Sequence, residues 1–306
     1  MNFSTLQNLD RKKTTINTVT LLDDNPIPSF IDINITELCN RKCVFCPRHD
    51  DALYPNQKLY MDIATAEAIS RQLVIIGFTG IINICGYGEP LLHPLIEEII
   101  AALNVHHVEI VTNGDFLTKQ KIISLHASGC QQMIVSLYDG PHQTEKFAAL
   151  FGESGLDQKF YSLRDRWYSK NDGYGVILTN RAGVLATDSI NQYVDKPCFY
   201  PHYSMTIDWN GDVLLCVQDW NKLIRFGNVR QTSMGTYSLK PPKNTSSSSS
   251  IDPKSQPIYQ IWTSEAFNKY RSALMTCRSL EPCKKCDCNG TIYGKDHAIA
   301  WSNNQQ

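Results

Sequence analysis

Three cysteines within residues 37–48, which read ELCNRKCVFCPR, constrain this chain more than any other feature. Cys39, Cys43 and Cys46 form a CxxxCxxC array. Three thiolates at this spacing can ligate three irons of a cubane iron–sulfur cluster and leave the fourth iron open, and an open coordination position is where a metal site does chemistry. Structural zinc is the alternative, but it usually takes four protein ligands in CxxC-like pairs. The array therefore favours an iron–sulfur cluster.

Composition narrows the class of protein. The chain has 306 residues, 42% of them hydrophobic, with a formal net charge of −1 and 11 cysteines. This length can bury a full core, and the small charge gives no electrostatic reason to expect nucleic acid or a membrane as partner. The first residues lack the apolar region of a secretory signal, and no apolar run reaches membrane-spanning length. We therefore predict a cytoplasmic protein whose clustered cysteines bind metal rather than form disulfides.

Apolar periodicity predicts an α/β fold. Residues 30–35 alternate apolar and polar side chains, so a strand should end directly before the cysteine loop. After it, the pattern predicts helices at 61–76, 95–104 and 119–128 that alternate with strands at 80–85, 108–112 and 132–137. Such alternation implies parallel strands joined by right-handed crossovers, with ligands gathered beyond the carboxyl ends of the strands.

The segment 137–175 is less regular. Residues 157–168 read as an amphipathic helix with solvated arginines, or as loops that contact a substrate. Residues 175–179 read as a fifth strand. Arg181 follows that strand and should emerge at the same strand-end surface as Glu89 and Ser136, so it is our preferred ligand for a carboxylate or a substrate.

The strand ends carry further signals. Cys85 and a GxGEP segment follow the second strand, Thr112-Asn113-Gly114 follows the third, and Ser136 lies near the end of the fourth. A GxGEP segment one βα unit after CxxxCxxC resembles the radical S-adenosylmethionine (SAM) superfamily. The resemblance implies a partial (β/α)6 parallel barrel and a [4Fe–4S] cluster whose open iron chelates SAM, which one electron cleaves to a 5′-deoxyadenosyl radical. An electron donor such as flavodoxin or ferredoxin is implied as a partner.

The same resemblance assigns cofactor-binding residues. Phe45, the aromatic residue before the third cysteine, would lie near the SAM adenine. The glycines of GxGEP would let the backbone approach the ligand, and Glu89 would accept hydrogen bonds from the methionine ammonium. The residues implied to bind SAM are Phe45, Gly86, Gly88, Glu89, Asn113 and Ser136.

A second cysteine module follows near the C-terminus. Cys198 and Cys216 flank a hairpin predicted at 205–208 and 212–215, with Asn210-Gly211 as a type I′ turn, and Cys283 and Cys286 form a CxxC. A zinc ribbon is the alternative. The arrangement resembles the superfamily's auxiliary module, called the twitch domain, the short form of the SPASM domain. It implies one auxiliary [4Fe–4S] cluster on these four cysteines, with Cys277 and Cys288 as alternative ligands or free thiols.

These patterns predict a domain order. We expect an irregular lead-in at 1–28, a radical SAM core at 29–195, an auxiliary cluster domain at 196–290 and a tail at 291–306. The serine-rich segment 234–257 cannot bury enough apolar surface to fold and should be a flexible insertion.

The leading functional hypothesis follows from resemblance to the aminocyclitol dehydrogenases of the superfamily. It is oxidation of a secondary alcohol of a sugar or cyclitol to a ketone, with the auxiliary cluster accepting the second electron. A radical epimerase is an alternative, for which Cys85 is the best hydrogen-atom donor, although packing is the commoner role of a buried cysteine. A peptide-modifying maturase and a non-catalytic metal scaffold are further alternatives.

Overall fold

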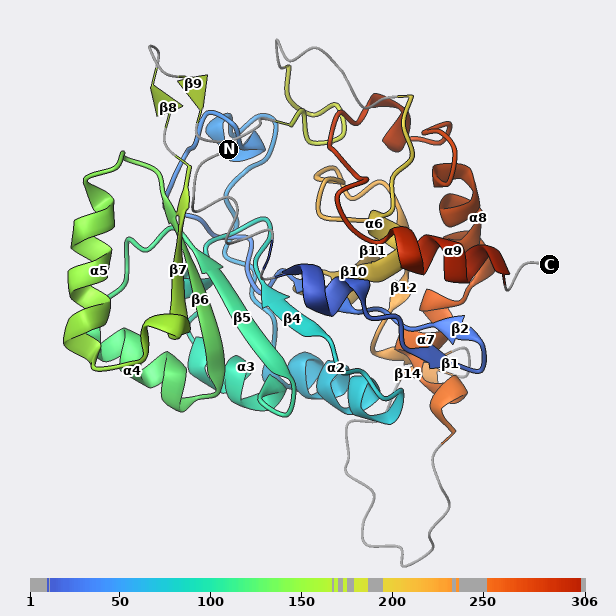
Figure 1. Cartoon of the computed structure of the whole chain (residues 1–306), viewed down its shortest axis with the longest axis horizontal. Coiled ribbons are helices and arrows are strands. Elements are labelled where there is room, and N and C mark those ends of the chain that lie inside the picture. Colours follow the sequence, from blue (N-terminus) through green and yellow to red (C-terminus); the bar gives the residue numbers. More distant parts are fainter. Residues whose placement is uncertain are drawn as a thin grey trace, which may run out of the picture.

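The computed structural model describes residues 10, 12–166, 168–169, 173–174, 179–186, 195–232, 235–236 and 252–303. At its centre is an eight-stranded sheet with the order β12-β11-β10-β3-β4-β5-β6-β7 (Figure 1). The strands from the first half of the chain are β3 (Phe30–Ile33), β4 (Ile81–Ile84), β5 (His107–Thr112), β6 (Cys130–Leu137) and β7 (Tyr161–Asp165). They pair in parallel in sequence order, so all their carboxyl ends meet at one edge of the sheet.

Helices join these strands and cover the sheet. They are α2 (Ile63–Ile75), α3 (Ile96–Leu103), α4 (Lys119–Ala127) and α5 (Gln143–Ser154), and Figure 1 shows α2, α3 and α4 in a row along one side. Asp62 caps α2 by accepting from Thr65 N, and Thr118 caps α4 in the same way. Their apolar stripes pack on the sheet in one continuous core. The helices and strands predicted before residue 137 are thus confirmed to within about two residues.

The predicted helix at 157–168 is wrong. A short 3-10 turn, η3 (Gln158–Phe160), leads directly into β7, which pairs in parallel with β6. Apolar Tyr161 and Leu163 alternate with polar Ser162 and Arg164, as is typical of a strand. The alternation covers too few residues to stand out in the sequence. The Tyr161 ring stacks on Phe151 of α5 at 4.1 Å between centroids, which anchors the strand. Of the strand predicted at 175–179, all but Thr179 lies outside the described residues.

The C-terminal strands extend the same sheet. β10 (Ser204–Ile207) pairs in parallel with β3, and β11 (Asp212–Leu214) and β12 (Arg225–Asn228) continue outward in antiparallel fashion. The expected hairpin is present, but its turn is not type I′. Gly211 has φ +87 while Asn210 is not left-handed, and Gly211 N donates to Asp208 O at 2.9 Å. Three residues rather than two separate Asp208 from its partner Asp212, so the turn is a three-residue loop that ends in a left-handed glycine.

The lead-in at 1–28 is more regular than predicted. Residues 12–17 are helical, and β1 (Leu21–Leu22) and β2 (Asn25–Pro26) form a hairpin around Asp23 and Asp24, which both have positive φ. Contacts from the C-terminal half hold it, among them a hydrogen bond from Tyr259 Oη to Leu22 O at 3.0 Å and one from Trp262 Nε1 to Pro26 O at 2.7 Å. Partners so distant in sequence leave no local signal.

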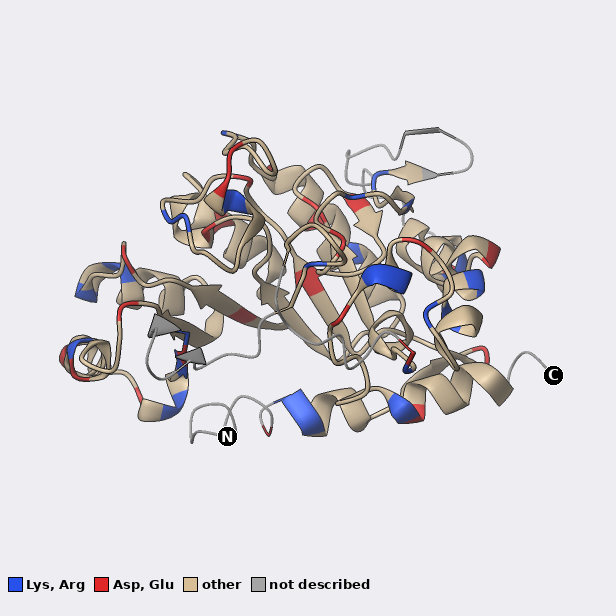
Figure 2. Cartoon of the chain, turned by 90° about the horizontal axis from the view of Figure 1, so that it is seen from above, with Lys and Arg blue, Asp and Glu red and all other residues tan. Residues whose placement is uncertain are grey.

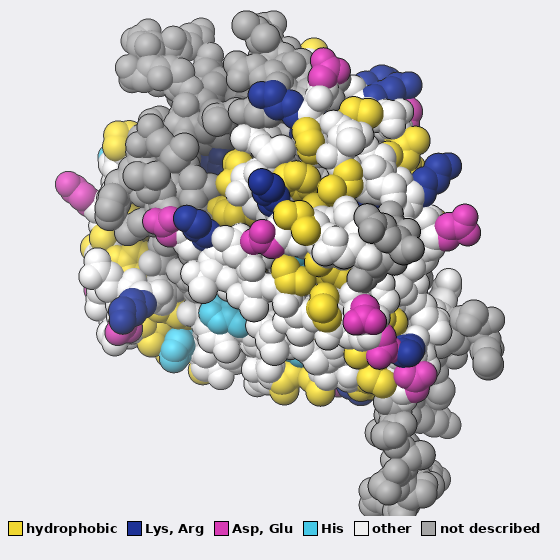
Figure 3. Space-filling model, turned by 45° about the vertical axis from the view of Figure 1, so that its right-hand side comes forward, with side chains coloured by type: hydrophobic (Ala, Val, Ile, Leu, Met, Phe, Trp, Pro, Cys, Tyr) yellow, Lys and Arg dark blue, Asp and Glu magenta, His cyan; other side chains and the backbone are white. Residues whose placement is uncertain are grey.

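The remaining helices gather at the β10–β12 end of the sheet (Figure 1). They are α6 (Tyr200–Tyr203), α7 (Pro257–Trp262), α8 (Glu265–Leu274) and α9 (Lys295–Asn303). Short 3-10 turns are η1 (Pro47–His49), η2 (Pro90–Leu92), η4 (Pro253–Ser255) and η5 (Cys283–Lys285), and two-residue strands are β8 (Tyr168–Ser169), β9 (Gly173–Tyr174), β13 (Gln231–Thr232) and β14 (Gly235–Thr236). Within the described ranges, every helix is too short or too polar to span a bilayer. Figures 2 and 3 show acidic and basic residues interspersed.

Candidate active site

The loop after β3 carries Cys39, Cys43 and Cys46 at the carboxyl end of that strand. This loop, residues 34–48, is called the cluster loop below. Cys46 N donates to Cys43 O at 2.9 Å, and Asn56 clamps the start of the array by accepting from Cys39 N at 2.9 Å and donating to Cys39 O at 2.7 Å. Burial raises the pKa of the Cys43 thiol to about 12, and the nearby Cys46 and Cys39 add to the rise. The three thiols therefore share one electrostatic environment.

The donor set of this loop fits an iron–sulfur cluster. Among the described residues, no three or more His, Cys, Asp or Glu side chains are arranged so that they could hold a single metal ion. Three soft thiolates on one loop are the kind of ligand that an iron–sulfur cluster takes. The ligand roles of the three cysteines stay a prediction.

A buried charge network holds the cluster loop to the C-terminal half. Glu37 is 2% exposed and accepts from Arg48 Nη2 at 2.7 Å, from Asn34 Nδ2 at 3.1 Å and from Lys222 Nζ. Lys222 Nζ also donates to Asp208 Oδ2 at 2.5 Å, and Asn34 Nδ2 to Asp208 Oδ1 at 2.8 Å. Because Asp208 and Lys222 flank β11, the network fixes the cluster loop against that part of the sheet. No sequence motif pointed to these residues.

The GxGEP glycines allow close packing on the segment that follows β3. A Cβ at Gly88 would lie 2.2 Å from Thr36 O, and one at Gly86, where φ is +135, would lie 2.9 Å from Asn34 Cβ. Both neighbours belong to the segment that connects β3 to Cys39. The glycines therefore let the second strand end pack directly on the cluster loop, an effect that the sequence alone could not separate from approach to a ligand.

Glu89 ties two strand ends together. Its carboxylate accepts from Thr112 Oγ1 at 2.6 Å, from Asn113 N at 2.8 Å and from Leu91 N at 3.1 Å. Burial raises the pKa of Glu89 to about 7, and these hydrogen bonds oppose the rise. Glu89 is 3% exposed, so its predicted bond to the methionine ammonium would be added to an already well-bonded carboxylate.

Asn113 lies beside the cluster loop. Asn113 Nδ2 donates to Asn40 Oδ1 at 2.8 Å, next to Cys39 in the sequence. Ser136 is fully buried on β6, and Arg164 Nη2 of β7 donates to its Oγ at 2.9 Å. The structure thus places both predicted SAM-binding residues at the same edge of the sheet, and it adds Arg164 as the partner of Ser136.

Phe45 stacks on an aromatic ring from another strand end. Its ring lies 5.7 Å from that of Tyr138, which follows β6, with an interplanar angle of 21°. Arg41 covers the same Tyr138 ring at 5.3 Å and pairs with Asp115 at 2.5 Å and Asp139 at 2.7 Å. These contacts brace the cluster loop against β5 and β6. Arg41 and Tyr138 were not among the predicted site residues.

Cys85 sits in a polar group on the face of the sheet that Asp32 shares. Cys85 Sγ lies 3.3 Å from Asp32 Oδ1 and accepts from Asn83 Nδ2 at 3.0 Å, while Ser204 Oγ donates to Asp32 Oδ2 at 3.1 Å. Burial, and then the Asp32 carboxylate, raise the pKa of Cys85 well above its usual value. The side chain is therefore held as a thiol rather than a thiolate.

Arg181 lies between the two cysteine modules. It has left-handed φ 50. Burial raises the pKa of Cys46 in one module and of Cys288 in the other, and the positive charge of Arg181 opposes both rises. Burial lowers the pKa of Arg164, the partner of Ser136, and the charge of Arg181 adds to this effect. Its Nε is buried and has no hydrogen-bond acceptor among the described residues. The expectation that Arg181 reaches the strand-end surface agrees with these neighbours.

The four cysteines of the second module also come together. Burial raises the pKa values of Cys216 and Cys283 well above the usual value, and every pair among Cys198, Cys216, Cys283 and Cys286 interacts electrostatically. Cys288 is buried beside Cys198 and Cys286, whereas Cys277 is exposed. Cys277 and Cys288, which sequence spacing could not tell apart, thus differ in burial. The four predicted ligands remain a group in which each cysteine is close to the other three.

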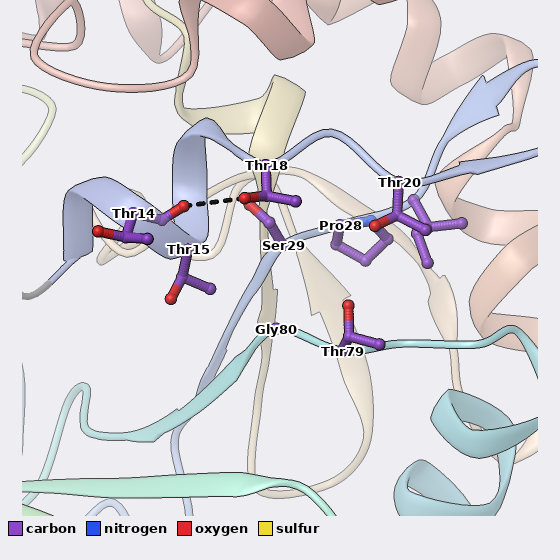
Figure 4. A pocket seen from close by; sticks show the side chains of 9 residues that line it. Thr14, Thr15, Thr18, Thr20, Pro28, Ser29, Thr79 and Gly80 are labelled. Atoms are coloured by element: carbon purple, nitrogen blue, oxygen red, sulfur yellow. Dashed lines mark hydrogen bonds between the residues drawn. The ribbon is translucent and has the colours of Figure 1, made fainter.

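One recess lies away from this region and another lies beside it. One, of about 210 Å³, is at the opposite end of the sheet, where Ser29 and Gly80 precede β3 and β4 (Figure 4). Thr14, Thr15, Thr18, Thr20 and Thr79 also line it, and Thr18 Oγ1 donates to Thr14 O at 3.0 Å. The other, of about 290 Å³, lies over the charge network and is lined by Glu37, Lys222, Tyr54 and Trp220 among others.

Comparisons with known proteins agree with this geometry. Residues 33–152 match the sequence model of the Radical SAM superfamily, and residues 198–236 match SPASM, an iron–sulfur cluster-binding domain. The S-adenosyl-L-methionine-dependent 2-deoxy-scyllo-inosamine dehydrogenase of Niallia circulans is 25% identical over 267 residues, 85% of this chain and 92% of that protein. The GTP 3′,8-cyclase of Chlorobaculum tepidum is 32% identical over 138 residues, 42% of this chain and 38% of that protein.

A solved structure shares the fold. The crystal structure of BtrN in complex with AdoMet and 2-DOIA superposes with a TM-score of 0.66 and 24% sequence identity, over 89% of this chain and 98% of that one. A mainly parallel sheet with its extra C-terminal strands and helices is therefore an arrangement that both chains adopt. The fold prediction is confirmed.

Proposed function

This chain is a radical SAM enzyme with a SPASM-type iron–sulfur domain, and from that premise we propose that it oxidises a secondary alcohol of a sugar or cyclitol to a ketone. The position of Arg181 carries the proposal. Its charge acts on Cys46 of the first module and on Cys288, which lies beside Cys198 and Cys286 of the second, so a substrate bound to Arg181 would lie near both proposed centres. The Niallia circulans relative, a dehydrogenase of 2-deoxy-scyllo-inosamine, supports the substrate class.

The proposed reaction balances with two centres. Oxidation of a carbinol removes a hydrogen atom from carbon, a proton from oxygen and one more electron. When bound, SAM on the first cluster supplies the radical that takes the hydrogen atom, and the auxiliary cluster supplies the acceptor for the electron. A chain with only the first centre would need another electron acceptor, so the second cysteine module fits an oxidation.

The residues proposed to hold these groups follow the geometry above. Cys39, Cys43 and Cys46 would ligate the first cluster, and Cys198, Cys216, Cys283 and Cys286 the auxiliary one. Phe45, Gly86, Gly88, Glu89, Asn113 and Ser136 would surround SAM. Arg181 would bind the substrate or the SAM carboxylate with its unpartnered Nε.

Hydroxyl groups of the substrate need polar partners at the strand ends. Asn83 Oδ1 and Arg164 Nε are buried and have no hydrogen-bond partner among the described residues. Buried polar atoms are normally paired, so these two offer one acceptor and one donor to a polyhydroxylated ligand. The proposal therefore places the substrate over Asp32, Asn83 and Arg164.

Epimerisation is the second candidate, because the Cys85 thiol lies in the same polar group. An epimerase would return a hydrogen atom to the substrate from such a thiol, and no ketone would form. The two reactions share SAM cleavage, so only the product separates them.

The test is an anaerobic assay with reconstituted, dithionite-reduced protein. Candidate cyclitols and amino sugars, beginning with 2-deoxy-scyllo-inosamine, are incubated in deuterated water, and 5′-deoxyadenosine and products are measured by mass spectrometry. We expect 5′-deoxyadenosine and a ketone, and neither from the Cys43→Ala variant. Solvent deuterium on a carbon of an unoxidised product, lost in Cys85→Ala, would instead establish epimerisation.

A further inference from the structure

Arg278 is a buried cation bonded to the segment that carries the auxiliary cysteines. The side chain is 3% exposed. Its Nη1 donates to Cys286 O at 2.6 Å, its Nη2 to Cys288 O at 2.5 Å and its Nε to Lys196 O at 3.2 Å. All three acceptors are neutral main-chain carbonyls. Among the residues that the structure describes, no carboxylate forms an ion pair with this guanidinium; the nearest acidic groups acting on the same thiols are Asp287 at Cys286 and Asp219 at Cys283.

That charge faces the thiols. Arg278 opposes the rise in pKa that burial causes at Cys198, Cys283 and Cys286, three of the four proposed ligands, and at Cys288. Interactions between charges are strong here because burial limits screening by solvent and salt. The guanidinium is always charged and is held as a planar fork, so its position relative to the thiols is fixed.

A fixed cation beside a cluster changes the energy of adding an electron. A cubane held by four thiolates is anionic, and reduction adds one more negative charge. The nearby positive charge favours the reduced form, so it raises the reduction potential, which local charge and hydrogen bonding are known to set in iron–sulfur sites.

We propose that Arg278 is a positioning residue that raises the reduction potential of the auxiliary cluster and so makes that cluster a better acceptor for the substrate electron. The inference rests on the auxiliary centre of the proposed function. It goes further because it assigns control of the reduction potential of that cluster to Arg278, a role that the pattern of cysteine ligands does not reveal.

Arg278 also connects two chain segments, so a loss of stability alone would not test the proposal. A reduction potential would, because a purely structural role leaves the potential of an assembled cluster unchanged. The measurement is a potentiometric titration followed by electron paramagnetic resonance. The full chain is used with Cys39, Cys43 and Cys46 replaced by Ala, so that only the auxiliary cluster contributes to the spectrum.

Two neutral variants, Arg278→Gln and Arg278→Met, are compared with Arg278→Lys, which keeps the charge. We expect a neutral variant to lower the reduced-to-oxidised ratio at a fixed potential by about tenfold, which is about 59 mV for a one-electron couple. The Lys variant should stay closer to the parent. Lys284→Gln is the matched control, since Lys284 follows Cys283 but is 53% exposed and paired with Glu281, and it should shift the midpoint little.

Iron and sulfide analysis shows which neutral variant assembles the cluster, and that variant is used. An unchanged midpoint in a cluster-loaded neutral variant would overturn the proposal, as would an equal shift in Lys284→Gln. Because the titration needs neither SAM nor substrate, it stays informative if the alcohol oxidation itself proves wrong.

Discussion

Arg48 donates Nη2 to Glu37 at 2.7 Å, and both side chains are 2% exposed. The pair spans the cysteine loop, because Glu37 precedes Cys39 and Arg48 follows Cys46. Arg48 Nε donates in addition to Tyr87 O of the GxGEP segment, and Lys222 completes the charge balance from the C-terminal half. One buried network therefore connects the cluster loop, the second strand end and the C-terminal part of the sheet.

Removing Lys222 should be costly. Lys222→Met leaves Glu37 and Asp208 with one cation fewer in a buried site, and loss of one partner of a buried pair costs about 3–5 kcal/mol. Lys42→Met breaks an exposed pair with Asp51 and should cost less than about 1 kcal/mol. Urea denaturation of both variants measures the difference. Equal free energies of unfolding would contradict the role of the network.

Gly290 should be indispensable for the auxiliary site. A Cβ at Gly290 would lie 2.2 Å from Cys198 Sγ, so Gly290→Ala should displace this proposed ligand and lower the iron content. At Gly152 in α5, an added Cβ would meet nothing within 4 Å, and Gly152→Ala should stabilise the protein by about 0.5–1 kcal/mol. Iron analysis measures the effect of Gly290→Ala, and thermal unfolding measures the effect of Gly152→Ala. Full iron content in Gly290→Ala would refute the close contact with Cys198.

The surplus cysteines should differ from the predicted ligands. We expect about eight irons per reconstituted chain and about four in Cys216→Ala, as for two [4Fe–4S] clusters of which one is lost. Cys277→Ala, at an exposed position, should retain all of them. Cys288→Ala should also retain them, because Cys198, Cys216, Cys283 and Cys286 already supply the four thiolates that a [4Fe–4S] cluster takes. A loss of about four irons in Cys288→Ala would assign Cys288 to the cluster.

His297 should make the fold sensitive to acid. Burial lowers its pKa to about 4, whereas an unfolded histidine titrates near 6.5. Above about pH 6.5 the ring is neutral in both states, so it has no effect there. Below that pH the unfolded state binds the proton first, and folding stability falls by roughly 1.4 kcal/mol per pH unit until about pH 4.

The variant His297→Gln tests this dependence. Its unfolding free energy, measured by denaturant titration, should decline less steeply than that of the parent between about pH 6.5 and pH 4, while at pH 7.5 the comparison reports only the change in packing. Parallel pH profiles for the two proteins would show that His297 titrates alike in both states.

The local sequence was enough to predict the cluster loop, the strand ends and the order of helices and strands, because each of these depends on residue spacing within one βα unit. It missed β7, whose alternation spans only Tyr161–Asp165, and the pairing of β10 with β3, which joins Ser204 to Phe30. It also missed Lys222 and Arg278. Their significance comes from Glu37 and from the thiols they face, and no short-range pattern encodes contacts so distant in sequence.

The central claim is that two iron–sulfur centres act on one substrate, and product analysis of two variants tests it most directly. In single-turnover reactions with reduced protein, SAM and substrate, we measure 5′-deoxyadenosine and ketone together by mass spectrometry. The account predicts that Cys43→Ala forms neither, and that Cys216→Ala still cleaves SAM but forms little ketone. Ketone from Cys216→Ala at the rate of the parent would contradict it.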